Sequence, residues 1–133
     1  MKIVKLNDSV AVSEQIGVED VAAIANQGYK VLVNNRPDGE APDQPTSADI
    51  ASAAEAAGLS YYYFPVTATN FPGPDAETMA TLLNNPERPV LAFCRTGTRC
   101  TNLWVSTRED DGKAAAVQQA RTLGYDLAMS GNK

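Results

Sequence analysis

The chain has 133 residues, of which 44% are hydrophobic and 20% charged, a composition typical of one globular domain spanning residues 1–133. Its net charge of −5, without a basic run, argues against nucleic acid as a partner, and no apolar run approaches the ~20 residues of a membrane span. The absence of histidine excludes Ser–His and Cys–His catalysis within the chain. With only two cysteines, we expect no metal site and no cofactor.

Apolar segments and turn residues alternate in a pattern that predicts strands and helices in turn. We expect short edge strands at residues 3–6 and 10–12, and further strands at residues 30–34, 60–66 and 90–93. Helical spacing and end signals predict helices at residues 18–26, 47–57, 74–83, 100–108 and 113–123, with a turn at residues 110–112. This alternation predicts an α/β fold, a mainly parallel central sheet flanked by helices on both faces. Ligands of such sheets lie beyond the carboxyl ends of the strands.

The strongest functional signal lies at residues 89–99. A short apolar strand brings Cys94 to a glycine-containing loop that ends at Arg99, and a helix follows. Fixed positive charge and the N–H groups of a helix N-terminus favour the thiolate form of a cysteine, and they also hold anions. The pattern therefore predicts Cys94 as a catalytic nucleophile. Arg99, whose forked donors match a sulfate-like or phosphate-like group, is the predicted anion holder.

Neighbouring residues are candidates for substrate binding, and several have an alternative role. Gly97 allows the backbone to bend sharply and approach a ligand. Arg95 either contacts substrate or points to solvent, and the hydroxyls of Thr96 and Thr98 either donate to the thiolate or are solvated. Arg36 follows the strand at residues 30–34. It either forms a second wall of the pocket or pairs with Asp38 to fix a turn, and the second interpretation is slightly favoured.

Two further side chains have open roles. Cys100 is either a resolving thiol for an oxidised Cys94 or a small buried residue, and the buried role is favoured. Asp75 is a candidate general acid, but its place after Pro74 favours a helix N-terminal role. Because one of two cysteines is needed as a thiol, we expect a reducing, cytoplasmic location.

Three segments resemble a known family: residues 34–40 (NNRPDGE), Pro65-Val66, and residues 94–99 (CRTGTR). They are similar to the small bacterial phosphatase-like domain that also occurs fused to a metallo-β-lactamase-type hydrolase, and the resemblance extends from about Val12 to Leu127. It implies a fold like that of dual-specificity phosphatases, with the nucleophile loop between a strand and a helix. It places Cys94 and Arg99 in the family's cysteine loop and implies a metallo-β-lactamase-type hydrolase as a partner.

The sequence departs from true tyrosine phosphatases. Their signature has five residues between cysteine and arginine, preceded by His and followed by Ser or Thr. Here there are four, residues 95–98; Phe93 precedes the cysteine and Cys100 follows the arginine. The acid of dual-specificity enzymes follows a Pro-Val strand end, where this chain has Thr67 and Ala68. Rhodanese-type sulfurtransferases resemble the six-residue loop more closely, and sulfur transfer needs less protonation of the leaving group.

The first hypothesis is therefore a sulfurtransferase that moves sulfur from a small anionic donor through a Cys94 persulfide to an acceptor thiol. The alternative is a phosphatase-like hydrolase acting through a phosphocysteine. A third hypothesis is a non-catalytic anion-binding or redox-sensing module, in which Cys94 and Cys100 form a disulfide.

Overall fold

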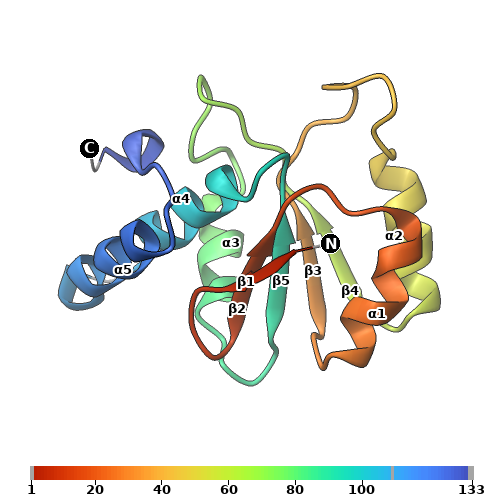
Figure 1. Ribbon diagram of the computed structural model, residues 1–133, viewed down its shortest axis with the longest axis horizontal. Helices are drawn as coiled ribbons and strands as arrows, with labels where there is room; N and C mark the ends of the chain where they lie inside the picture. The colour runs from red at the N-terminus through yellow and green to blue at the C-terminus, as the bar shows by residue number, and fades with distance from the viewer. Residues whose placement is uncertain (1, 109, 132–133) are drawn as a thin grey trace.

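The computed structural model describes residues 2–108 and 110–131, in which a five-stranded sheet separates two layers of helices (Figure 1). The strands are β1 (Ile3–Lys5), β2 (Val10–Ser13), β3 (Val31–Asn34), β4 (Ser60–Tyr63) and β5 (Val90–Phe93). The α-helices are α1 (Val21–Asn26), α2 (Ser47–Ala56), α3 (Ala76–Leu83), α4 (Thr98–Ser106) and α5 (Asp110–Thr122). Two short 3₁₀ helices, η1 (Val18–Asp20) and η2 (Ala128–Ser130), complete the elements.

The sheet has the strand order β1-β2-β5-β3-β4, and only the β1–β2 pair is antiparallel. The predicted α/β architecture with a mainly parallel sheet is therefore confirmed. The prediction of an edge strand at residues 10–12 is wrong, because β2 lies between β1 and β5. Its residues are all buried, as is typical of a parallel strand covered on both faces.

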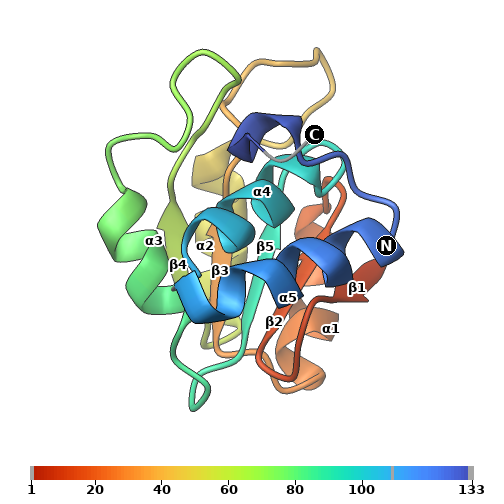
Figure 2. The ribbon, with the colours of Figure 1, turned by 90° about the vertical axis from the view of Figure 1, so that its left-hand side faces the viewer.

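Each face of the sheet has its own core, because successive strand residues point to opposite sides. Figures 1 and 2 show α3, α4 and α5 on one face, and α1 and α2 on the other. Val33 and Ala92 point toward the first layer, where they join Leu103 and Trp104 of α4. The other core contains Leu32, Leu91 and Phe93 of the sheet with Ile24 and Ile50 of the helices.

The three inner strands end level with one another, which fixes where the loops meet. Phe93, the last residue of β5, is paired on one side with Ser13 and on the other with Asn34. The chain leaves β3 toward α2 on one face and leaves β5 toward α4 on the opposite face. Diverging connections of this kind open a crevice at the carboxyl ends of parallel strands. Gln15, Arg36 and Cys94 all lie within two residues of these ends.

Several predicted boundaries differ from the structure. Strand β4 ends at Tyr63 instead of residue 66, and helix α4 begins at Thr98 instead of residue 100. The turn predicted at residues 110–112 is wrong, because these residues are the first of α5. Glycine in a helix costs about 1 kcal/mol relative to alanine, a cost that burial of Ala116 and Ala120 against the core can offset. Among the described residues, no helix has both the length and the apolar character that crossing a membrane requires.

We expect Leu32→Ala to lower the free energy of unfolding by about 2–5 kcal/mol, since Leu32 is fully buried in the central strands. The matched change Leu123→Ala removes the same atoms from a side chain that is 38% exposed, and should cost no more than about 1 kcal/mol. Urea unfolding of both variants measures the difference. Equal losses would contradict the packing described for the sheet.

Candidate active site

Cys94 is the first residue after β5, at the start of a loop of six residues that we call the cysteine loop (residues 94–99). The N–H of Gly97 donates a hydrogen bond to the Cys94 Sγ at 3.1 Å. Gly97 has a φ of +88° and a buried position, and a Cβ there would lie 3.4 Å from the Tyr125 hydroxyl. A left-handed conformation in so confined a place favours glycine over any other residue. The loop therefore turns its backbone N–H groups toward the sulfur.

The surroundings of Cys94 lower the pKa of its thiol to about 5. The largest cause is the hydrogen bond from the Cys100 side chain. The backbone N–H groups of Cys100 and Thr96 and the charge of Arg99 add to it, against burial, which raises the pKa. Burial raises the pKa of Cys100 well above its ordinary value, so this thiol keeps its proton. Cys94 is therefore a thiolate at neutral pH, with Cys100 as a hydrogen-bond donor beside it.

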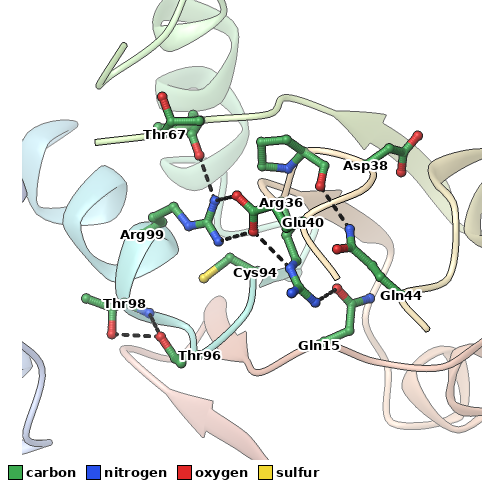
Figure 3. Close-up of polar contacts among 12 residues, drawn as sticks. Gln15, Arg36, Asp38, Glu40, Gln44, Thr67, Cys94, Thr96, Thr98 and Arg99 are labelled. Atoms are coloured by element: carbon green, nitrogen blue, oxygen red, sulfur yellow. Dashed lines mark hydrogen bonds and ion pairs between the residues drawn. The ribbon is translucent and has the colours of Figure 1, made fainter. Parts of the chain in front are cut away.

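Both cysteines are free and fully buried. The favoured prediction for Cys100, a small buried side chain, agrees with its place in the core beside Leu103. The burial of Cys94 has a consequence for chemistry: a substrate can reach Sγ only when side chains above the cysteine loop move apart. Figure 3 shows the Arg99 guanidinium on the same side of the loop as the Cys94 sulfur, with the Glu40 carboxylate bound to it.

Arg99 is held by the protein on one edge of its guanidinium and left open on another. Its two terminal nitrogens donate to the two carboxylate oxygens of Glu40, at 2.9 and 2.7 Å, and Nη1 also donates to the Val66 carbonyl at 2.9 Å. These bonds use three of its five donors. Within the described part of the chain, the remaining edge, formed by Nε and the outer hydrogen of Nη2, has no acceptor. Two parallel donors on one edge match two oxygens of a tetrahedral oxyanion.

Glu40 links the two arginines that the sequence singled out. Its Oε1 accepts from Arg36 Nε at 3.0 Å as well as from Arg99, while Arg36 Nη1 donates to Gln15 at 3.1 Å (Figure 3). The hydrogen bond from Arg99 is the largest cause that lowers the pKa of Glu40, so this carboxylate remains charged at neutral pH. The sequence gives no role to Glu40 or Gln15; the only signal for Glu40 is its place in the NNRPDGE segment.

Arg36 does not form the slightly favoured pair with Asp38. Asp38 instead accepts from the backbone N–H of Ser47 at 2.8 Å, and its own N–H donates to the Tyr63 hydroxyl. The Asp38 carboxylate thus binds the first residue of α2 and not Arg36. Arg36, which is only 6% exposed, is left to line the pocket beside Arg99.

The threonine hydroxyls of the cysteine loop do not reach the sulfur. The Thr96 hydroxyl donates to the Thr98 hydroxyl at 3.1 Å, so the predicted donation from these hydroxyls to the thiolate is absent. The contribution of Thr96 to the low pKa of Cys94 comes from its backbone N–H. The sequence can indicate that a loop is rich in hydrogen-bond donors. It cannot indicate whether the backbone N–H groups or the side-chain hydroxyls face the sulfur.

Arg95 and Asp75 lie in different surroundings. Arg95 is exposed and lines an open hollow of about 450 Å³, which we call the mouth pocket, with Arg36, Glu40, Ala41 and Arg99. Asp75 lines a separate closed recess with Phe64, Pro65 and Val66, and it takes the N-cap position of α3 without a side-chain cap bond. Its predicted place at a helix N-terminus is thus observed, and it does not line the mouth pocket.

The described residues contain no group of three or more His, Cys, Asp or Glu side chains placed to hold a metal ion. The donors gathered at the cysteine loop are N–H groups and guanidinium groups, which bind anions. The site can therefore hold a small oxyanion against a thiolate.

Comparisons with known proteins agree with this geometry. Residues 2–110 match the family model of the phosphatase-like domain of β-lactamase hydrolase-like proteins. A β-lactamase hydrolase-like protein of Agrobacterium fabrum is 34% identical over 98% of this chain, and the matched region is 31% of that protein. The chain spans less than a third of the length of the curated relatives it matches.

Solved structures show the same fold. The crystal structure of a "putative phosphatase" from Neisseria meningitidis is 38% identical, with a TM-score of 0.80 over 96% of this chain and 92% of that one. Kinase-associated phosphatase, solved with its catalytic cysteine replaced by serine, is 12% identical with a TM-score of 0.68, over 96% of this chain and 84% of that one; at this identity it shows the fold alone. The sheet and its two helix layers thus have the fold of cysteine phosphatases. The chain belongs to the family of phosphatase-like domains of β-lactamase hydrolase-like proteins.

Proposed function

We propose that the chain is a cysteine-dependent hydrolase of small phosphate compounds, in which Cys94 is the nucleophile and Arg99 binds the phosphoryl group. The observation that carries this proposal is the free edge of the Arg99 guanidinium beside a thiolate that accepts a hydrogen bond from the Gly97 N–H. The family and the fold of the solved phosphatases support it.

The reaction has two steps. The Cys94 thiolate attacks phosphorus, the bond from phosphorus to the leaving oxygen breaks, and a phosphocysteine forms. Water then attacks the phosphocysteine, which releases inorganic phosphate and restores the thiolate. In both steps the Arg99 edge and the loop N–H groups hold the phosphoryl oxygens, where negative charge is stabilised. The thiol of Cys100 stabilises the thiolate that leaves in the second step.

Protonation of the leaving group limits the substrates. Glu40 is the one carboxylate that lines the mouth pocket, and its ion pairs with two arginines keep it deprotonated. Asp75 lines a different recess, and the Thr67 hydroxyl is hydrogen-bonded to Asn70. Without a general acid, expulsion of an alkoxide loses about two to four orders of magnitude in rate. We therefore infer that substrates have leaving groups of low pKa, such as nitrophenolates, the carboxylates of acyl phosphates, or phosphates.

The free edge of Arg99 beside the Cys94 thiolate also supports a second candidate function, that of a sulfurtransferase. Here the thiolate attacks the outer sulfur of thiosulfate or of a persulfide, and sulfite or a thiolate leaves without needing a proton. The resulting Cys94 persulfide passes its outer sulfur to an acceptor thiolate, which regenerates Cys94. Both reactions need free thiols, so a reducing compartment such as the cytoplasm suits either one.

The relatives also suggest a context for the reaction. Their names and their greater length support the expectation that this domain works beside a β-lactamase-like hydrolase unit. Such a unit would consume the product or supply the substrate of Cys94.

We expect the ultraviolet absorbance of the Cys94 thiolate, taken as wild type minus Cys94→Ser, to rise with a midpoint at about pH 5. The sign follows from the lowered pKa: the thiolate is lost only as the pH falls through that value. Cys100→Ala removes the thiol hydrogen bond, which is the largest cause of the low pKa, and should move the midpoint to higher pH. A midpoint near the ordinary cysteine pKa of ~8.5 would contradict the activated nucleophile.

We expect the purified protein to release phosphate from 4-nitrophenyl phosphate and to act far more slowly on phenyl phosphate, whose leaving group is more basic. Cys94→Ser should abolish both activities, while Asp75→Asn should leave them within about twofold, since no role in protonation is assigned to it. Thiosulfate and an acceptor thiol, assayed on the same preparation, test the second candidate. A sulfur adduct on Cys94 by mass spectrometry, without phosphate release, would replace the first proposal with the second.

We expect Glu40→Gln to lower kcat/KM by about ten- to hundredfold, because Arg99 loses the ion pair that aims its free edge at the substrate. KM should rise and the midpoint of thermal unfolding should change little, since the Glu40 side chain is 30% exposed. Glu87→Gln, in the exposed segment before β5, is the matched control and should leave kcat/KM unchanged. If Glu40→Gln instead lowers KM, Glu40 competes with the substrate for Arg99.

A further inference from the structure

The mouth pocket carries more positive charge than one small anion requires. Its lining has three guanidinium groups, those of Arg36, Arg95 and Arg99, and one carboxylate, that of Glu40, so its formal charge is +2. The chain as a whole has a net charge of −5. A positive pocket on an acidic protein concentrates anions at one place and repels them elsewhere.

The three arginines are not equivalent. Arg99 is fixed by Glu40 and Val66 with one edge facing the reacting group, and Arg36 is tied to Glu40 and Gln15. Arg95 is exposed, and its side chain has no hydrogen-bond or ion-pair partner among residues 2–108 and 110–131. Its backbone is fixed all the same, because its carbonyl accepts from the Gln15 N–H at 3.3 Å. Arg95 therefore starts from a fixed backbone position at the rim of the pocket, and its exposed guanidinium is available to a ligand.

The size of the mouth pocket also indicates a ligand larger than one small anion. The mouth pocket is an open hollow of about 450 Å³. Cys94 is buried and is not among the lining residues, so an oxyanion held against its sulfur by Arg99 leaves most of this hollow free. The hollow, where Arg95 lies, can receive what is attached to the reacting group.

We propose that the natural substrate is a bifunctional anion, whose second anionic group, such as a carboxylate, is carried by the leaving group and bound by Arg95. This proposal rests on the proposed role of Cys94 and Arg99 in holding the reacting anion. It assigns Arg95 to substrate specificity, whether the transferred group is phosphoryl or sulfur.

Binding of unreactive phosphonates tests the proposal without turnover. Phosphonoacetate, 3-phosphonopropionate and 4-phosphonobutyrate each have an amide of the same size that lacks the carboxylate charge. At low ionic strength, calorimetric titration of the wild-type protein should show at least one acid bound about fivefold or more tightly than its amide. Arg95→Gln should remove this preference, because it weakens binding of the acid by more than binding of the amide, which loses only the general attraction of the positive pocket. Arg88→Gln, an exposed arginine hydrogen-bonded to Ser60 outside the pocket, should preserve the preference.

Equal affinities for every acid and its amide in the wild type would overturn the proposal, and so would a preference that survives Arg95→Gln. Failure of phosphate release from 4-nitrophenyl phosphate, with the Arg95-dependent preference intact, would instead count against the proposed hydrolase alone.

Discussion

The level ends of β2, β5 and β3 are the constraint on which the whole site depends. Parallel pairing sets Ser13, Phe93 and Asn34 side by side, so the chain segments that follow them emerge together at one edge of the sheet. Gln15, Cys94 and Arg36 are thereby brought within reach of one another although they are far apart in sequence. A slip of one residue in any of these pairings would exchange the side chains that the affected strand presents to the two cores, and it would separate the groups at the strand ends. The two cores that bury Leu32, Leu91 and Ala92 therefore also hold the site together.

Within that frame, charge is distributed in layers around the sulfur. The innermost layer is uncharged: the Gly97 N–H and the Cys100 thiol hydrogen-bond to Cys94. Arg99 comes next, and Glu40 holds it from outside. This order matters because a buried thiolate needs donors that cannot swing away into water, whereas a guanidinium that must also bind substrate needs one edge kept open. Glu40 keeps that edge open, because it binds the two terminal nitrogens of Arg99 and leaves the edge at Nε free.

The burial of Cys94 sets a limit on the chemistry. A thiolate with no exposed surface can react only with a group small enough to enter when the side chains at the mouth part, and water must be displaced as it does so. This favours a terminal phosphoryl or sulfur group over the interior of a large substrate. The positive mouth pocket is then the proposed place for the remainder of the substrate.

The sequence by itself determined the cysteine loop, because every element of that signal is local. An apolar strand, a cysteine, a glycine that can take a left-handed φ and a helix start are contiguous, and backbone geometry converts them into N–H groups around a sulfur. The alternation of strands and helices likewise fixed the α/β class and the helices on both faces. Burial of the strands on both faces decided that residues 10–12 form an inner strand, which an apolar triplet near the N-terminus could not indicate.

Only the tertiary structure decided which charges pair. Glu40 lies 59 residues from Arg99, and for Arg36 the sequence favoured Asp38 as partner. The approach of the segment after β3 to the cysteine loop gave Arg36 and Arg99 a shared carboxylate, while the start of α2 took Asp38. Ion pairs depend on the distance between side-chain ends, and that distance is set by how loops from different strands meet. For this reason the proposed nucleophile could be predicted from the sequence, whereas the carboxylate that holds Arg99 could not.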